Sequence, residues 1–208
     1  MTKKTTELDI RDGAINDAMA QLKKKYGSEV VLRLDEDSDI KTEFISTGSY
    51  GLDYVMGGGF PRRRIIEISG MQSSGKTALA LQFIARCQRL GMKCAFVDVE
   101  FSFDTEFAKM IGVDIKSLIY SQPANGEEAL SVVEELVATG AIDVVVLDSV
   151  AALTPKKEID GELEKQDMAL QAKLLAKFLR RVTAVISITT DHRCTENKLR
   201  RNQECLLL

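Results

Sequence analysis

The fold is decided by the stretch Gly70-Met71-Gln72-Ser73-Ser74-Gly75-Lys76-Thr77, which fits the phosphate-binding pattern G-x-x-x-x-G-K-[ST]. Residues 64–69 before it indicate a strand, and residues 78–90 after it indicate a helix that Gly91 ends. In such a loop the backbone N–H groups curl around a polyphosphate at the positive end of the following helix. The stretch therefore predicts a nucleoside triphosphate site rather than a chance glycine-rich turn.

Two side chains of this phosphate loop, residues 70–77, have expected roles. Lys76 reaches the outer phosphates, and the Thr77 hydroxyl ligates Mg²⁺ directly. Residues 144–148 form an apolar strand that ends in the carboxylate Asp148. We expect Asp148 to hold the same metal through a water molecule, because a strand-end carboxylate in the same sheet is the usual partner of a phosphate loop.

A third candidate follows the strand expected over residues 94–98. Parallel strands point their carboxyl ends at the crevice that holds ligands, and Glu100 lies just past this end. A carboxylate there can orient and deprotonate the water that attacks the terminal phosphate. Asp98 is an alternative for this role, and a solvated loop acid is the alternative without catalysis.

Composition narrows the function classes. The 208 residues, 45% of them hydrophobic, allow one domain with a small appendage. A net charge of −3 gives no overall attraction to nucleic acid, so such binding must come from local loops or an assembled groove.

A single histidine, His192, disfavours histidine-based chemistry, and Cys87 and Cys94 are expected to be buried thiols. We expect a cytoplasmic protein with no membrane partner, because no apolar run resembles a signal peptide or a membrane span.

Short apolar runs alternate with helical patterns along the chain. Strands are expected over residues 94–98, 117–120 and 142–148, and helices over residues 104–111, 126–138 and 166–186. This alternation predicts an α/β fold with a mainly parallel sheet covered on both faces.

The N-terminal part has a different pattern. Residues 12–26 predict a helix and residues 30–32 a short strand, and a strand-and-turn segment begins at Phe44. The helix and strand are too small to bury much by themselves. They either pack on their own domain or form an arm that adds to a neighbouring subunit.

Several motifs, in this order, resemble the bacterial RecA family of filament-forming recombinases over roughly residues 12–190. They are residues 45–49, the phosphate loop, and residues 95–100, 121–123 and 146–156. The resemblance implies a three-layer RecA-like P-loop ATPase core that uses ATP and Mg²⁺. It also implies DNA-dependent ATP hydrolysis, sequence-independent binding of single- and double-stranded DNA, strand exchange in recombinational repair, and an SOS response with the SOS repressor as a partner. The alternatives are another ATPase of the same core, such as a helicase, and a non-catalytic nucleotide-binding fragment.

The resemblance also assigns residues in the nucleotide site by matched position. Lys76 and Glu100 would be catalytic, with Glu100 as the base. Asp104 would lie near the adenine amino group. Phe107 would stack on the adenine, where the family commonly has tyrosine.

Contacts with DNA and with other subunits are implied in the same way. Met168 and Lys173 match an apolar and a basic position that face DNA in the family. Residues 159–168 match its first DNA-binding loop, which is acidic here, so less DNA affinity is expected from this loop alone. Residues 14–32 match the segment that docks on the next filament subunit.

The resemblance ends after Thr190. We therefore expect an oligomerisation arm over residues 1–42, a partial core over residues 43–190 and an aberrant polar tail over residues 191–208. The family's sheet has a strand at this point of the chain, between the phosphate-loop strand and the Asp148 strand, so we expect a gap there and a truncated, impaired protein. A shifted reading frame after Thr190 is favoured over a real short protein with a divergent tail.

Overall fold

The computed structural model describes residues 7–27, 30–31, 42–153, 168–191 and 204–207. The chain divides into two compact units, Met1–Lys41 and Thr42–Leu208, and each is described by itself. The first contains α1 (Glu7–Tyr26), which carries three lysines in its last turn, where positive charge suits the helix dipole. Residues 30–31 form a bend rather than the strand expected over residues 30–32, and Leu32 lies outside the described residues. A strand needs a partner for its backbone groups, and the described part of this unit contains no second strand.

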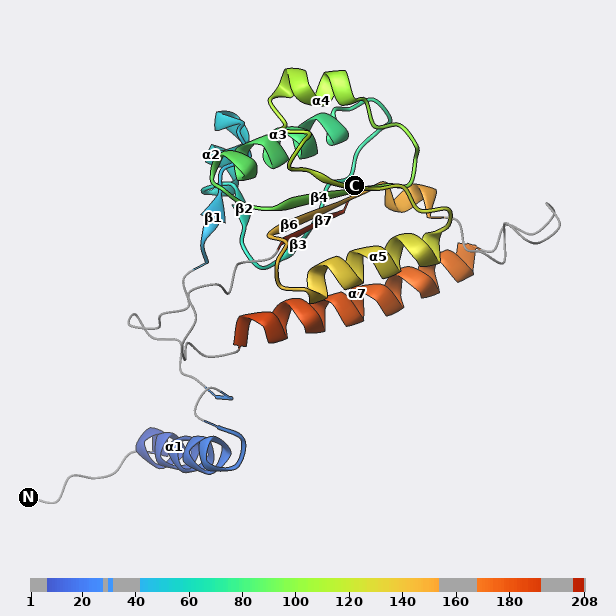
Figure 1. Ribbon diagram of the computed structural model, residues 1–208. Helices are drawn as coiled ribbons and strands as arrows, with labels where there is room; N and C mark the ends of the chain where they lie inside the picture. The colour runs from blue at the N-terminus through green and yellow to red at the C-terminus, as the bar shows by residue number, and fades with distance from the viewer. Residues whose placement is uncertain (1–6, 28–29, 32–41, 154–167, 192–203, 208) are drawn as a thin grey trace, which may run out of the picture. The chain divides into compact units, whose positions relative to one another are not determined.

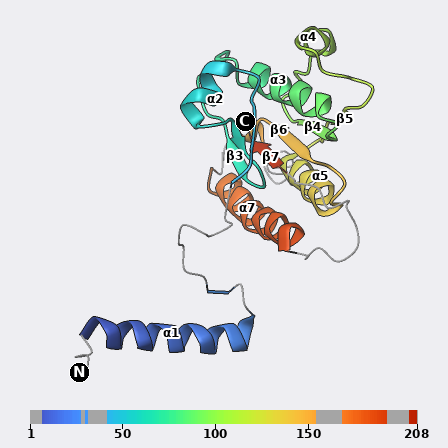
Figure 2. The same cartoon turned by 90° about the vertical axis from the view of Figure 1, so that its left-hand side faces the viewer.

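The second unit is built on a parallel five-stranded sheet of order β3-β7-β6-β4-β5 (Figure 1). Its strands are β3 (Ile65–Glu67), β4 (Cys94–Asp98), β5 (Ile119–Ser121), β6 (Val144–Asp148) and β7 (Glu204–Leu207). One face is covered by α3 (Lys76–Arg89) and α4 (Thr105–Ile111), and the other by α5 (Gly126–Ala138) and α7 (Met168–Asp191) (Figure 2). The predicted α/β fold with a parallel sheet is confirmed. No described helix is both long enough and apolar enough to cross a membrane.

Strands β4 and β6 show why the sheet needs cover on both faces, since every residue of both is buried. Their side chains alternate between two separate cores. Phe96 and Val146 belong to the core that includes α3 and α4, whereas Val97 and Leu147 belong to the core that includes α5 and α7. Cys87 and Cys94 are buried, as predicted. This continuous apolar pattern is typical of parallel strands buried on both faces.

Helix α7 closes the second core with one apolar side. Its most buried side chains are Phe178, Val182 and Ile186, at helical spacing. Arg181 on its edge forms an ion pair of 2.6 Å with Glu134 of α5. The apolar side of this helix is therefore the side that packs on the sheet and α5.

A small antiparallel hairpin precedes the phosphate-loop strand, with β1 (Phe44–Ile45) paired to β2 (Phe60–Pro61). Between them lies α2 (Tyr50–Met56), in a segment for which strands and turns were expected. Asp53 of α2 accepts hydrogen bonds from the Ser46 hydroxyl (2.5 Å), the Thr47 hydroxyl (2.7 Å) and the Thr47 N–H (2.8 Å). These bonds fix the turn that enters the helix.

The middle of the sheet is filled by β7, which pairs in parallel with β3 on one side and β6 on the other. Leu206 lies opposite Ile66 of β3 and Val146 of β6. The expectation of a gap at the middle of the sheet is wrong, because residues 204–207 form a strand there. The reason is that β3 and β6 present short rows of backbone N–H and C=O groups that need partners, and any extended segment of similar length can supply them.

Candidate active site

The phosphate loop joins β3 to α3, and its geometry requires a glycine at position 75, whereas a side chain at position 70 would only displace the Ser74 hydroxyl. Gly75, at the start of α3, has a φ of 92°, in the left-handed region that disfavours residues with a Cβ. A Cβ at Gly70 would lie 2.8 Å from the Ser74 Oγ. Because α3 begins at Lys76, its unpaired N-terminal N–H groups and the positive end of its dipole face the loop. The loop is thus an anion site formed by the backbone.

Lys76 folds back over this loop. Its Nζ donates hydrogen bonds to the carbonyl oxygens of Gly70 (3.2 Å) and Met71 (3.1 Å). These contacts hold the ammonium group above the loop, where it can meet an anion that the loop amides bind. The Met71 side chain, in contrast, is 84% exposed to solvent.

Thr77 and Asp148 form the oxygen-rich part of the site. The Thr77 hydroxyl donates a hydrogen bond of 2.6 Å to the Asp148 carboxylate, which is only 3% exposed. Burial raises the pKa of Asp148 and the charges of Glu100 and Asp98 add to this, whereas the Thr77 hydrogen bond and the charge of Lys76 act against it. A hydroxyl and a carboxylate are ligands that Mg²⁺ prefers, so this pair fits the metal expected here.

Glu100 and Asp98, the two candidates for the base, have different environments. Glu100 lines the cavity beside the phosphate loop and accepts a hydrogen bond of 2.5 Å from the buried Ser149 hydroxyl. Asp98 is fully buried and accepts hydrogen bonds from the N–H groups of Ser102 and Phe103. Glu100 is therefore the acid that faces the cavity, and Asp98 organises the loop that carries it.

A single cavity of about 990 Å³ joins these groups. Its wall is formed by the phosphate loop except Met71, by Glu100 and Phe107, by residues 148–151 at the end of β6, and by Gln171, Ala172 and Leu175 of α7. The volume is in the upper part of the range usual for small-molecule sites. An opening of this kind can hold a triphosphate at the loop and an attached group toward α4 and α7.

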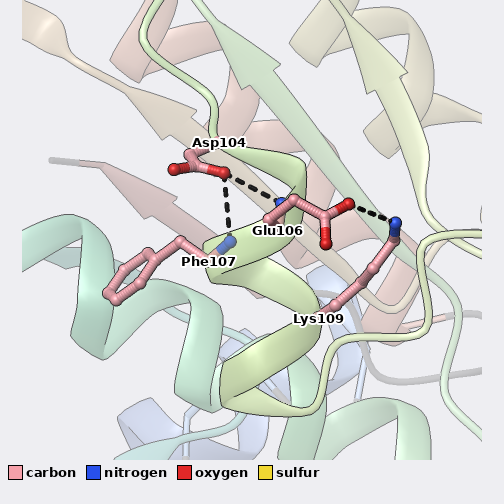
Figure 3. A network of polar contacts seen from close by, with 4 residues as sticks. All are labelled: Asp104, Glu106, Phe107 and Lys109. Carbon is pink, nitrogen blue, oxygen red and sulfur yellow. Dashed lines mark hydrogen bonds and ion pairs between the residues drawn. The ribbon is translucent and has the colours of Figure 1, made fainter.

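Asp104 and Phe107 lie at the start of α4 (Figure 3). The Asp104 carboxylate caps the helix by accepting hydrogen bonds from the N–H groups of Glu106 (2.9 Å) and Phe107 (3.0 Å). In the same helix, Glu106 of the first turn forms an ion pair of 2.6 Å with Lys109. Phe107 lines the cavity, whereas Asp104 is not among the described residues that line it. The cap nevertheless fixes the helix turn that carries Phe107.

The expected DNA contacts are described only in part. Residues 159–167 of the expected DNA-binding loop lie outside the described residues. Met168 is the first residue of α7, and Lys173 is exposed on the same helix.

Two polar residues of the site carried no prediction. Ser149 follows Asp148 directly, and its position at a strand end beside the crevice was a usable signal. Gln171 donates from its Nε2 to the carbonyl oxygens of Val150 (3.2 Å) and Ala151 (3.3 Å), which ties α7 to the segment after β6. A glutamine in an amphipathic helix gives no such signal in the sequence.

Comparisons with known proteins agree with this geometry. The family described as RecA N-terminal domain matches residues 13–205. The chain is 52% identical over 174 residues to Protein RecA of Wolinella succinogenes, covering 83% of this chain and 50% of the relative. It is 49% identical over 174 residues to Protein RecA of Chloroherpeton thalassium, covering 83% and 49%. For Protein RecA of Acinetobacter baumannii the identity is 50% over 171 residues, covering 82% and 49%. The chain thus spans about half the length of the curated relatives it matches.

Proposed function

Because the chain belongs to the family of the RecA N-terminal domain, we propose that it binds and hydrolyses ATP as the nucleotide-handling part of a RecA-type recombinase. The observation that carries this proposal is the cavity that brings the phosphate loop, the Thr77–Asp148 pair and Glu100 together. Each of these supplies one requirement of phosphoryl transfer: phosphate binding, metal ligands and a base.

Each group of residues in the cavity has a separate role in the proposed hydrolysis. The loop amides and the Lys76 ammonium group bind the phosphates and offset their charge. Thr77 and Asp148 would hold Mg²⁺, which supplies charge neutralisation on the phosphate oxygens when bound. Glu100, oriented by Ser149, holds the attacking water and accepts its proton.

For the base of the nucleotide, we assign stacking to Phe107, which lines the cavity. Asp104 has one carboxylate oxygen engaged in the helix cap, which leaves the other for the adenine amino group. A phenylalanine ring can stack on a purine without a hydroxyl, since the interaction uses the face of the ring.

We extend the proposal to DNA and to other subunits. Hydrolysis would respond to single-stranded DNA through Met168 and Lys173, because α7 carries both residues and also contributes Gln171 and Leu175 to the cavity. Residues 14–32 would dock on a neighbouring subunit of a filament. In the whole recombinase this activity would serve homologous pairing, strand exchange and the SOS response, including contact with the SOS repressor.

The test is steady-state ATP hydrolysis by the chain with and without single-stranded DNA. The proposal expects turnover that DNA increases and that Glu100→Gln abolishes. Glu135→Gln, the same change at an exposed position of α5, is the matched control and should leave turnover unchanged. DNA-independent turnover would indicate another ATPase of the same core, and nucleotide binding without turnover would indicate a non-catalytic fragment.

A further inference from the structure

The fully buried Asp98, at the end of β4, has three donors that converge on its carboxylate. Two are the N–H groups of Ser102 (3.3 Å) and Phe103 (3.0 Å), and the third is the Tyr120 hydroxyl (2.9 Å). A buried carboxylate is costly unless such donors satisfy it. The Asp98 carboxylate is therefore stable in the buried state only in the conformation that keeps these three donors in place.

Tyr120 reaches this carboxylate from the neighbouring strand. It lies on β5, opposite Phe96 of β4. The Phe103 ring packs against the aromatic rings of both residues, with its centroid 5.0 Å from that of Phe96 and 5.1 Å from that of Tyr120. Burial, followed by the hydrogen bond to Asp98 and its charge, raises the pKa of Tyr120 to about 12, so the hydroxyl remains a donor at neutral pH.

These contacts fix both ends of the short segment that contains Glu100. At its start, the Val99 N–H donates to the Asp148 carbonyl oxygen (2.7 Å). At its end, the amides of Ser102 and Phe103 are held by Asp98. Glu100 lies between these points and meets the Ser149 hydroxyl at the cavity. Its place over the phosphate loop thus depends on the closure of this segment.

We propose that Tyr120 is a positioning residue for Glu100, which acts through Asp98 on the loop of residues 99–103. This inference rests on the proposed ATP hydrolysis. Tyr120 itself is not among the described residues that line the cavity. Its hydroxyl affects the reaction only through the geometry of the loop.

The test is Tyr120→Phe in the full chain, which keeps the ring packed on Phe103 and removes only the hydroxyl. The kcat for ATP should fall roughly tenfold, because a small displacement of a catalytic group costs up to about 100-fold in rate. The KM and the affinity for ATP should stay unchanged, since the phosphate loop is not altered. Tyr50→Phe, at a side chain that is 90% exposed, is the matched control and should change neither quantity. An unchanged kcat, or a weakened ATP affinity, would overturn the proposal.

Amide hydrogen exchange separates this inference from the proposed function. In Tyr120→Phe the amides of Ser102 and Phe103 should exchange faster, while those of β4 should not change. If the unaltered chain does not hydrolyse ATP, the proposed function fails and exchange alone decides whether Tyr120 holds the loop. Equal exchange in the two proteins would overturn the role given to Tyr120, whatever the hydrolysis shows.

Discussion

Thr77, in the first turn of α3, and Asp148, the last residue of β6, are joined by a hydrogen bond of 2.6 Å between hydroxyl and carboxylate. The bond connects the phosphate loop to the strand end across 71 positions of sequence. It places two oxygen ligands together where a metal ion would meet the phosphates. Without the metal, the same place holds a buried carboxylate near two other acids, Glu100 and Asp98.

The first prediction concerns the stability cost of Asp148. Its pKa is raised by burial above the ordinary 3.8, so the folded state binds its proton more tightly than the unfolded state does. Its contribution to stability therefore falls as pH rises from about 3.8 through the folded-state pKa. Asp148→Asn should raise the Tm of the nucleotide-free chain at pH 7. The rise should be about 2–4 °C for each kcal/mol by which the free energy of unfolding increases. It should also weaken binding of Mg²⁺-ATP.

The measurement is thermal unfolding at pH 4 and at pH 7. The difference between Asp148→Asn and the unaltered chain should be larger at pH 7. Glu135→Gln serves as the control for removal of an exposed charge. A Tm difference that does not grow between the two pH values would contradict the role given to burial.

The second prediction concerns the hydrogen bond from Ser149 to Glu100. Ser149→Ala should lower kcat by roughly tenfold or more, since a hydrogen bond to a charged group is worth about 1.5–3 kcal/mol. Affinity for ATP should stay the same because Ser149 lies outside the phosphate loop. Steady-state kinetics check this, with Ser131→Ala on the exposed side of α5 as the control. A larger effect on KM than on kcat would mean that Ser149 binds substrate instead.

The sequence was most informative where structure is set by local pattern. An apolar run predicts the bounds of β4, and a helical period predicts those of α5. The structure has these elements at the predicted residues, Cys94–Asp98 and Gly126–Ala138. Helix α2 was missed because Gly51 and the glycines at 57–59 suggest turns, whereas Asp53 fixes the helix through bonds to residues earlier in the chain. Periodicity alone does not show such a bond.

Longer-range relationships were harder to predict. The residues of β7 form a short run in a polar segment, and their strand conformation depends on pairing with β3 and β6, which are distant in sequence. In the site, the spacing of the phosphate loop and the position of Asp148 at a strand end were visible. The contact of Gln171 with the segment after β6 and the contact of Tyr120 with Asp98 were not, because each joins two elements that are separate in the sequence.

The third prediction concerns β7 as the central strand. Leu206→Pro removes a backbone N–H inside the sheet, and each buried group left unpaired costs about 1–3 kcal/mol. The free energy of unfolding in urea should therefore fall by at least this amount. Leu206→Val keeps the N–H and should unfold much like the unaltered chain, which should itself unfold cooperatively. Equal midpoints for the proline and valine variants would show that the strand does not form.

The fourth prediction concerns Asp53 and acid. Burial would raise the pKa of Asp53, but hydrogen bonds from Ser46 and Thr47 and the charge of Arg86 together hold it below the ordinary 3.8. Its stabilising contribution is therefore complete above about pH 3.8 and is lost as pH falls through the lower folded-state pKa. In urea unfolding, the unaltered chain should have a higher free energy of unfolding than Asp53→Ala at pH 6. This difference should become smaller toward pH 3. A difference in the free energy of unfolding that is independent of pH would mean that the charge of Asp53 does not contribute to stability.

Nucleotide binding by the phosphate loop is tested most directly by the affinity of Lys76→Ala for Mg²⁺-ATP. Calorimetric titration should show affinity weakened by roughly 10- to 100-fold, the value expected for loss of a hydrogen-bonding charge. Lys116→Ala, at an exposed lysine outside the cavity, should bind ATP as the unaltered chain does. Equal affinity of the Lys76→Ala and Lys116→Ala proteins for Mg²⁺-ATP would show that the phosphate loop does not bind nucleotide.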